Sequence, residues 1–172
     1  MLNWDGIREE AVKILGDLIR INTTNPPGNE LAAAQYIQRL LAAEGITARF
    51  YETSSGRGNL VARLPGSGAE RPLALLSHLD VVAANPGQWQ YNPFAGTVAD
   101  GYIWGRGALD MKGMLTMELL ALMLLKRSDQ VLKRDVILIA AADEEAGGVC
   151  GMESLLGQAL PDLADIEFVI NE

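Results

Sequence analysis

Apolar residues recur with helical spacing in several parts of the chain. In residues 5–20 they return every three or four positions, which predicts a helix with one buried face. The same spacing returns between Asn29, a residue type that caps helices, and Gly45, a residue type that ends them. Residues 112–126 are rich in leucine and methionine and predict a long third helix. We expect one more short helix after Gly151.

Shorter apolar stretches predict strands of two kinds. Residues 47–53 and 59–64 alternate between apolar and polar positions, which is typical of half-exposed antiparallel strands. Residues 72–77 and 136–142 are almost continuously apolar, as central strands covered on both faces are, and residues 168–170 are a third stretch of this kind. Strands separated by helices predict an α/β fold with a mixed, mainly parallel central sheet flanked by helices.

Composition and charge narrow the class of protein. The 172 residues are 49% hydrophobic and 21% charged, which suits one globular domain with a substantial core. A net charge of -8 argues against nucleic acid as a partner, because binding a phosphate backbone needs a basic face. The apolar runs are too short to span a bilayer, and the first residues, which include acids and no apolar run, do not resemble a signal peptide. With Cys150 as the single cysteine, we expect no internal disulfide and a cytoplasmic location.

Residues that can carry chemistry follow the predicted central strands directly. In open α/β sheets, ligands collect at the carboxyl ends of such strands. The first strand leads to His78, the only histidine, and to Asp80, which lies two residues further on the same side of an extended backbone. Three consecutive acids at positions 143–145 follow the second strand, and Glu172 follows the third.

Each of these features also fits an ordinary structural role. His78 could form a routine hydrogen bond, residues 143–145 could be an exposed acidic turn, and Asp110 could cap the helix that follows it. Glycines at 147–148 favour a functional interpretation, because they let the backbone curl so that neighbouring acids converge. Taken together, one histidine and several acids at strand ends are typical of a carboxylate-rich site for a divalent metal.

Five segments, in this order, resemble the M20 metallopeptidase family. That family includes aminoacylases, acetylornithine deacetylase, succinyl-diaminopimelate desuccinylase and the carboxypeptidases G2 and S. The segments are residues 77–80 (SHLD), 89–94, 105–113 (GRGALDMKG), 143–148 (DEEAGG) and 171–172 (NE). The resemblance extends from the first predicted helix to the last residue and implies a zinc-peptidase-like catalytic domain.

The resemblance implies two divalent metal ions and a set of ligands for them. His78 and Glu172 would bind the first ion, Glu145 the second, and Asp110 would bridge both. Zinc suits such a site, and cobalt or manganese could replace it. In the family the peptide bond after the bridging aspartate is typically cis, which here is the bond between Asp110 and Met111.

The resemblance also implies a reaction. Glu144 would be the general base for water that attacks the amide bond of a peptide or an N-acyl amino acid. Asp80 would hold the His78 ring so that its other nitrogen binds metal. Lys112 and Arg106 could steer a substrate carboxylate, although salt bridges on the helix surface or in the loop are the more ordinary interpretation.

One part of the family site has no counterpart in this sequence. The family's second metal ion also has a distant histidine ligand, which follows an inserted lid and dimerisation domain, and this chain has neither. We therefore expect residues 1–172 to be the N-terminal part of the catalytic domain of a homodimeric parent protein, and to be nearly inactive alone. The alternative is a short protein that binds a metal or a partner without catalysis.

Overall fold

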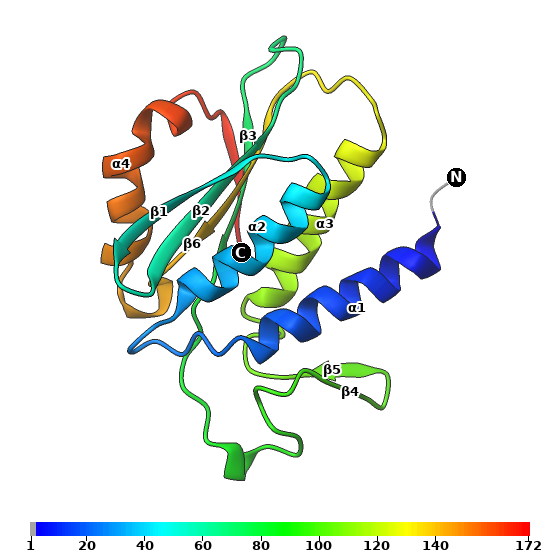
Figure 1. Cartoon of the computed structure of the whole chain (residues 1–172), viewed down its shortest axis with the longest axis vertical. Helices are drawn as coiled ribbons and strands as arrows, with labels where there is room; N and C mark the ends of the chain where they lie inside the picture. Colours follow the sequence, from blue (N-terminus) through cyan, green and yellow to red (C-terminus); the bar gives the residue numbers. More distant parts are fainter. Residues whose placement is uncertain (1–2) are drawn as a thin grey trace.

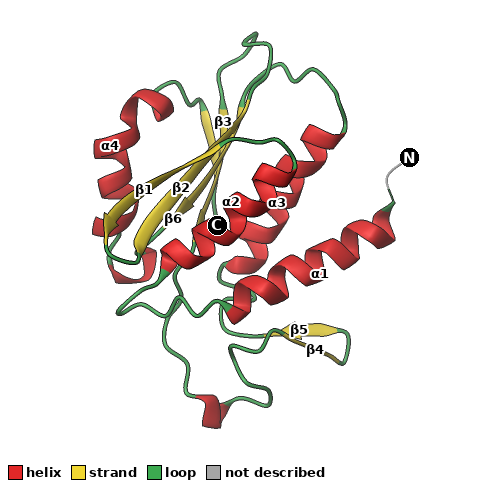
Figure 2. Cartoon of the chain, viewed as in Figure 1, coloured by secondary structure: helices red, strands yellow, loops and turns green. Residues whose placement is uncertain are grey.

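The computed structural model describes residues 3–172 and shows a central sheet with helices on both of its faces (Figure 1). Figure 2 shows the same arrangement by secondary structure. The helices are α1 (Trp4–Arg20), α2 (Glu30–Ala43), α3 (Lys112–Arg127) and α4 (Ser154–Leu163). The strands of the sheet, in spatial order, are β1 (Ala48–Ser54), β2 (Arg57–Leu64), β6 (Val136–Ala141), β3 (Leu73–His78) and β7 (Phe168–Ile170). The predicted mixed α/β fold is confirmed.

The direction of the strands decides where the site forms. β2 pairs antiparallel with both β1 and β6, whereas β3 runs parallel to β6 and to β7. In the β3–β6 register, His78 lies opposite Ala141, so these two strands end at the same level. The carboxyl ends of β6, β3 and β7 therefore meet at one edge of the sheet, which is where ligands bind in open α/β folds.

Two apolar clusters cover the two faces of the sheet. The larger cluster packs α1, α2 and α3 against one face and includes Leu60 and Leu138, while the smaller packs α4 against the other and includes Val61 and Ile139. Successive residues of β2 and β6 thus point into different clusters, as the twofold repeat of a strand requires. The prediction that residues 59–64 are half exposed is wrong, because α4 covers the second face of β2.

β7 corrects a second expectation. Its apolar sequence indicated a strand covered on both faces, but Phe168, Val169 and Ile170 are 56%, 54% and 45% exposed. Among residues 3–172, β7 pairs with β3 and with no other strand, so it lies at the edge of the sheet. A short apolar run is equally compatible with an edge strand, and the sequence pattern alone does not separate the two.

A small hairpin was not predicted. β4 (Thr97–Ala99) and β5 (Tyr102–Trp104) pair antiparallel beneath α1 (Figure 1). Asp100 and Gly101 join them with φ of 54° and 80°, the left-handed conformation that a two-residue hairpin turn requires. The Asp-Gly pair was the available signal, but each strand has only three residues and too short a pattern to read.

The helices follow the predicted ranges closely, with one difference at a cap. Asn3 caps α1 by accepting a hydrogen bond from the Gly6 amide, but the Asn29 side chain makes no such bond to α2. No helix within residues 3–172 combines the length and the apolar character needed to cross a membrane.

Candidate active site

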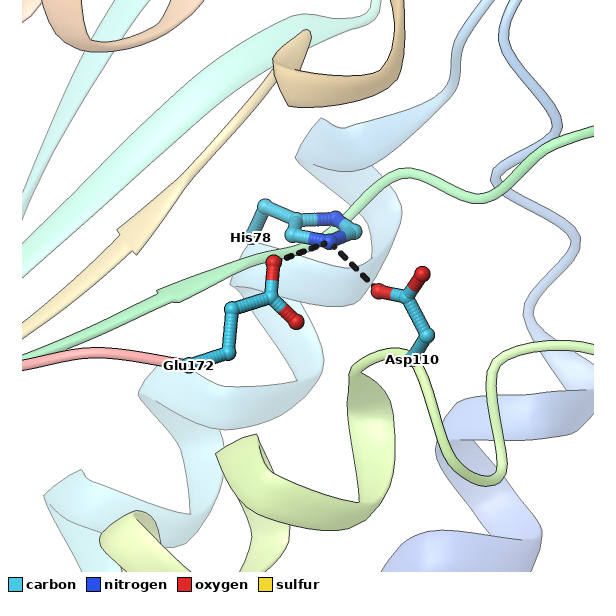
Figure 3. Close-up of side chains that lie close together, drawn as sticks. All are labelled: His78, Asp110 and Glu172. Atoms are coloured by element: carbon cyan, nitrogen blue, oxygen red, sulfur yellow. Dashed lines mark hydrogen bonds and ion pairs between the residues drawn. The ribbon is translucent and has the colours of Figure 1, made fainter.

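Three residues that are far apart in the sequence meet at the carboxyl edge of the sheet. His78 ends β3, Asp110 stands in the loop before α3, and Glu172 follows β7. The Nε2 atom of His78 lies 3.0 Å from Asp110 Oδ1 and 3.6 Å from Glu172 Oε1. Figure 3 shows the two carboxylates pointing at the same ring nitrogen. The three residues offer ligand atoms that all lie within 4.8 Å of one another.

The two glutamates of the acidic loop, residues 143–148, lie at different places. Glu144 Oε2 is 3.9 Å from His78 Nε2, and the Glu144 side chain is 58% exposed. Glu145 is half-buried and does not join the cluster of His78, Asp110 and Glu172. Its pKa is raised, first by burial and then by the negative charge of Asp110. Glu145 is therefore close enough to both Asp110 and His78 for their charges to affect its pKa.

Asp80 lies behind the histidine, as the sequence spacing suggested. It is fully buried, and His78 Nδ1 lies 3.0 Å from its main-chain oxygen and 3.4 Å from its Oδ1 atom. Burial lowers the pKa of His78, but the carboxylates of Asp80, Asp110 and Glu144 outweigh that effect and raise it to about 9. With Nδ1 directed at Asp80, the Nε2 atom is the one that faces the exposed acids.

The donor set suits a divalent cation. One imidazole nitrogen and several carboxylates converge here, and Glu172, like Glu145, has a raised pKa because of burial and the nearby charge of Asp110. Carboxylates that repel one another in this way are stabilised when a cation lies between them. Mixed imidazole and carboxylate ligands are those of zinc, cobalt and manganese sites.

The acidic loop turns sharply and divides its acids between two sides. Asp143 is buried with φ of 67°, and a short 3-10 helix, Glu144–Ala146, follows it. Gly147 and Gly148 then adopt φ of 104° and 76°, conformations that glycine accepts readily. The first acid therefore points into the protein while the next two remain at the sheet edge, and the loop is not the simple exposed turn that the sequence left open.

Asp110 does not cap α3. Met111 stands at the N-cap position, and the Asp110 side chain is 60% exposed and directed at His78. The peptide bond between Asp110 and Met111 is cis, as the family resemblance implied.

Lys112 neither lines the site nor forms a surface salt bridge, the two roles that the sequence had suggested. It is 1% exposed, and its Nζ donates to the main-chain oxygens of Leu18 and Ile21 at 2.9 and 2.8 Å. Both oxygens belong to the C-terminal end of α1, so Lys112 ties α3 to α1. Neither substrate steering nor a surface salt bridge describes it. Arg106 packs over the Trp89 ring at 5.5 Å from its centroid.

A cavity of about 360 Å³ opens beside the histidine. Its lining includes the polar residues His78, Glu144 and Glu172 and the apolar residues Leu76 and Met152. Its volume is in the range of pockets for small molecules. The site therefore combines converging acids with room for a small ligand.

Comparison with known proteins agrees with this geometry. The profile of Peptidase family M20/M25/M40 matches residues 74–172, more than half of the chain. The chain belongs to this family, whose members are metal-dependent hydrolases of amide bonds. The resemblance that the five sequence segments carry is thereby confirmed.

Curated relatives come from several bacteria. A probable succinyl-diaminopimelate desuccinylase of Staphylococcus epidermidis is 35% identical over 138 residues, which are 80% of this chain and 33% of the relative. A succinyl-diaminopimelate desuccinylase of Cereibacter sphaeroides is 34% identical over 149 residues, 86% of this chain and 38% of the relative. The chain thus spans only about a third of the length of these relatives.

Solved structures share the fold. An M20 family metallo-carboxypeptidase of Sulfolobus solfataricus superposes with a TM-score of 0.81 and 25% identity over 94% of this chain and 36% of its own. Human carnosine dipeptidase 1 gives a TM-score of 0.76 and 24% identity over 96% and 38%. A Bacillus subtilis protein described as a dinuclear metal binding peptidase of the family gives 0.67 and 20% over 96% and 42%.

Proposed function

We propose that this chain supplies the larger part of a two-metal hydrolytic site that cleaves an amide bond in a peptide or an N-acyl amino acid. One observation carries the proposal: His78 Nε2 faces the carboxylates of Asp110 and Glu172 at 3.0 and 3.6 Å, in a member of a peptidase family. These residues are the predicted ligands of the first metal ion. Asp110 and Glu145 are the proposed ligands of the second.

The metal ions would supply Lewis acidity, which polarises a carbonyl group and lowers the pKa of water. Zinc is the proposed metal, because imidazole and carboxylate donors suit it, and cobalt or manganese would be functional substitutes. Asp80 would keep the His78 ring in one orientation through its contacts with Nδ1.

Glu144 is the proposed general base. Its side chain is exposed and lies next to the histidine, so it can reach both water and a bound substrate. It would accept a proton from the attacking water and return it to the leaving nitrogen, a role that typically contributes 10²–10⁴-fold to the rate. Glu145 is less exposed than Glu144 and is influenced by the charge of Asp110, which supports a different role for it as a ligand of the second ion.

The substrate that we propose is small. The cavity beside His78 is lined by both polar and apolar residues, which suits a molecule with a carboxylate and an acyl or side-chain group. The name of the relatives, succinyl-diaminopimelate desuccinylase, refers to a small N-acyl amino acid, which supports a substrate of this size. Nucleic acid remains excluded from the proposal by the net charge of -8.

We further propose that residues 1–172 are one part of the catalytic domain. The chain contains a single histidine, so the second metal ion has two carboxylate ligands from it and needs another ligand from elsewhere. Together with the length of the relatives, this suggests that further residues complete the second site and form the dimer contact. The 172 residues alone are then expected to hydrolyse substrate very slowly, with zinc or cobalt added.

A chimera tests the proposal. This chain replaces the matched region of the Staphylococcus epidermidis relative, and hydrolysis of N-succinyl-diaminopimelate and of N-acetyl amino acids is measured with zinc. We expect turnover, and we expect Glu144→Gln to lower kcat by about 10²–10⁴-fold while Glu153→Gln, an exposed neighbour, leaves it unchanged. A chimera that folds and binds zinc without hydrolysing any of these amides would instead favour a non-catalytic metal-binding protein.

A further inference from the structure

A buried polar network lies directly behind the candidate active site. We call it the anchor network and define it as Asn25, Glu30, Arg57, Asp80 and Asp143. Its three acidic residues are buried, each at most 6% exposed. Buried carboxylates are costly unless they are paired and hydrogen-bonded, so the partners of these acids are part of what the site depends on.

Asn25 connects two of the acids. Its Nδ2 atom donates to Asp80 Oδ2 at 2.8 Å and to Asp143 Oδ1 at 2.9 Å. The main chain around Asn25 is held against the segment that follows β3. The Asn25 amide donates to the Val81 oxygen at 2.9 Å, and the hydroxyl of nearby Thr23 donates to the main-chain oxygen of Leu79. The amide group of Asn25 therefore sets the distance between the aspartate behind His78 and the first acid of the acidic loop.

Arg57 provides the positive charge of the network. Its guanidinium donates two bonds to Glu30, at 2.7 and 2.8 Å, and one to Asp143 Oδ1 at 2.7 Å. It also donates to the main-chain oxygen of Pro27 at 3.1 Å, and its side chain is only 13% exposed. Charged bonds of this planar, bidentate kind fix orientation as well as charge.

The network reaches the acidic loop at three main-chain groups. Asp80 accepts the amides of Glu144 and Glu145, each at 3.1 Å. Asp143 accepts the Cys150 amide at 2.9 Å with its second oxygen. The backbone that carries the proposed base and the proposed second-site ligand is thus held on carboxylates that Asn25 and Arg57 hold in turn.

We propose that Arg57 and Asn25 are positioning residues for the acidic loop. Their side-chain hydrogen bonds go to Asp80, Asp143, Glu30 and Pro27 and to none of the proposed ligands, so they act through Asp80 and Asp143, which keep Glu144 and Glu145 directed at the metal site. This inference rests on the proposed function, since it concerns how the proposed ligands and base are held. A simpler role, in which Arg57 only neutralises buried Glu30, predicts a different outcome of the test below.

Replacing the whole ion pair separates the two roles. In the double variant Arg57→Met/Glu30→Met, two apolar side chains of similar length take the place of the pair, an exchange that is often neutral or stabilising in a protein interior. If Arg57 only neutralises Glu30, the double variant regains both stability and metal binding. If Arg57 positions the acidic loop, the double variant regains only the stability lost with unpaired Glu30, and metal binding stays weak because Asp143 still lacks its partner.

Cobalt is the probe, because its visible absorption reports both occupancy and coordination geometry. Co²⁺ is titrated into the 172-residue chain, and His78→Ala shows which part of the signal comes from the site. We expect the double variant to bind Co²⁺ about 10–100-fold more weakly than the unmodified chain, with an altered visible band, as is typical when residues behind metal ligands change. Arg57→Lys, which keeps the charge, should recover part of the affinity, and exposed Arg49→Met should change neither readout.

Asn25→Ala gives an independent measurement. It removes no charge and leaves the Arg57–Glu30 pair in place, so it reports on positioning even if the Arg57 variants fold poorly; we expect a loss of about tenfold in Co²⁺ affinity. Folded variants that match the unmodified chain in affinity and in visible band would overturn the inference and leave the proposed function standing. Absence of His78-dependent Co²⁺ binding in the unmodified chain would overturn the proposed function, and the inference with it.

Discussion

Two groups of carboxylates lie at the same end of this sheet and have opposite environments. The inner group is buried and consists of Glu30, Asp80 and Asp143. The outer group is largely exposed and consists of Asp110, Glu144 and Glu172. Arg57, Asn25 and main-chain amides bind the inner group, whereas the outer group faces a single histidine.

The difference separates acids that hold the backbone of the site in place from acids that are available to bind a cation. A buried carboxylate must have its partners within the protein, because water cannot reach it. An exposed carboxylate can remain available for a cation that arrives from solution. Residues 143–145 contain both kinds in sequence, since Asp143 points inward and Glu144 points outward. Identical chemistry at adjacent positions is thus divided by the backbone turn between them.

The largest expected effect comes from breaking the inner group. Arg57→Met should lower the free energy of unfolding by about 3–5 kcal/mol, because it leaves two buried carboxylates without their cation. Urea unfolding followed by circular dichroism measures this. Arg49→Met is the matched control, since Arg49 pairs with Asp162 at the surface and is 70% exposed; its loss should stay below about 1 kcal/mol. Equal losses in the two variants would mean that the buried ion pairs of the inner group contribute no more to stability than a surface salt bridge does.

Occupying the outer group should stabilise the chain. Zn²⁺ at about one hundred times its Kd should raise the free energy of unfolding by about 2.7 kcal/mol, because the ion binds the folded state alone. Thermal unfolding with and without zinc, and with a chelator added back, measures the effect. His78→Ala should abolish it. A zinc effect that survives this substitution would show that the ion binds elsewhere.

Lys112 is a buried charge close to the outer group, and replacing it tests whether its hydrogen bonds contribute to stability as those of the inner group do. It follows Asp110 by two residues but bonds the main-chain oxygens of Leu18 and Ile21. Lys112→Met should cost about 1.5–3 kcal/mol, the usual contribution of hydrogen bonds from a charged group. Lys126→Met, an exposed lysine at the other end of α3, should be nearly neutral in the same unfolding experiment. Similar values for both would mean that Lys112 contributes no more than a surface residue.

The sequence was most informative about the outer group. Its residues stand at or directly after strand ends, and parallel strands bring those ends to one edge without any further information. His78 and Glu172 are 94 positions apart (172 minus 78), yet the β3–β7 pairing carries both to the same place. Their side chains were therefore placed together by topology alone, although their proposed roles came from the family resemblance.

The contacts of the inner group could not be predicted from the pattern of the sequence. Arg57 is 86 residues from Asp143, and Asn25 is 118 residues from it. No period or turn signal marks such a contact, because it depends on how α2 and the loop before it pack on the sheet. Lys112 was misjudged for the same reason: a lysine at the start of a helix is usually exposed, and only the close packing of α1 buries it.

The smallest expected effect concerns Glu118, a buried acid with few partners. It lies on α3 and accepts one bond, from the Ser77 hydroxyl at 2.5 Å, while its Oε1 atom has no hydrogen-bond partner among residues 3–172. Burial raises the pKa of Glu118, and the bond from Ser77 offsets this only in part. The folded state therefore keeps this proton to higher pH than the unfolded chain does.

The sign of the pH effect follows from that difference. Stability from Glu118 is fully present below its unfolded pKa, near 4.3, and is lost as the pH rises through the higher folded value. Glu118→Gln cannot titrate, so its stability relative to the unmodified chain should increase between pH 4 and pH 7, by on the order of 1 kcal/mol. Urea unfolding across this range measures the slope, with exposed Glu9→Gln as the control. A constant offset between Glu118→Gln and the unmodified chain would mean that Glu118, like the inner group, is already adequately paired.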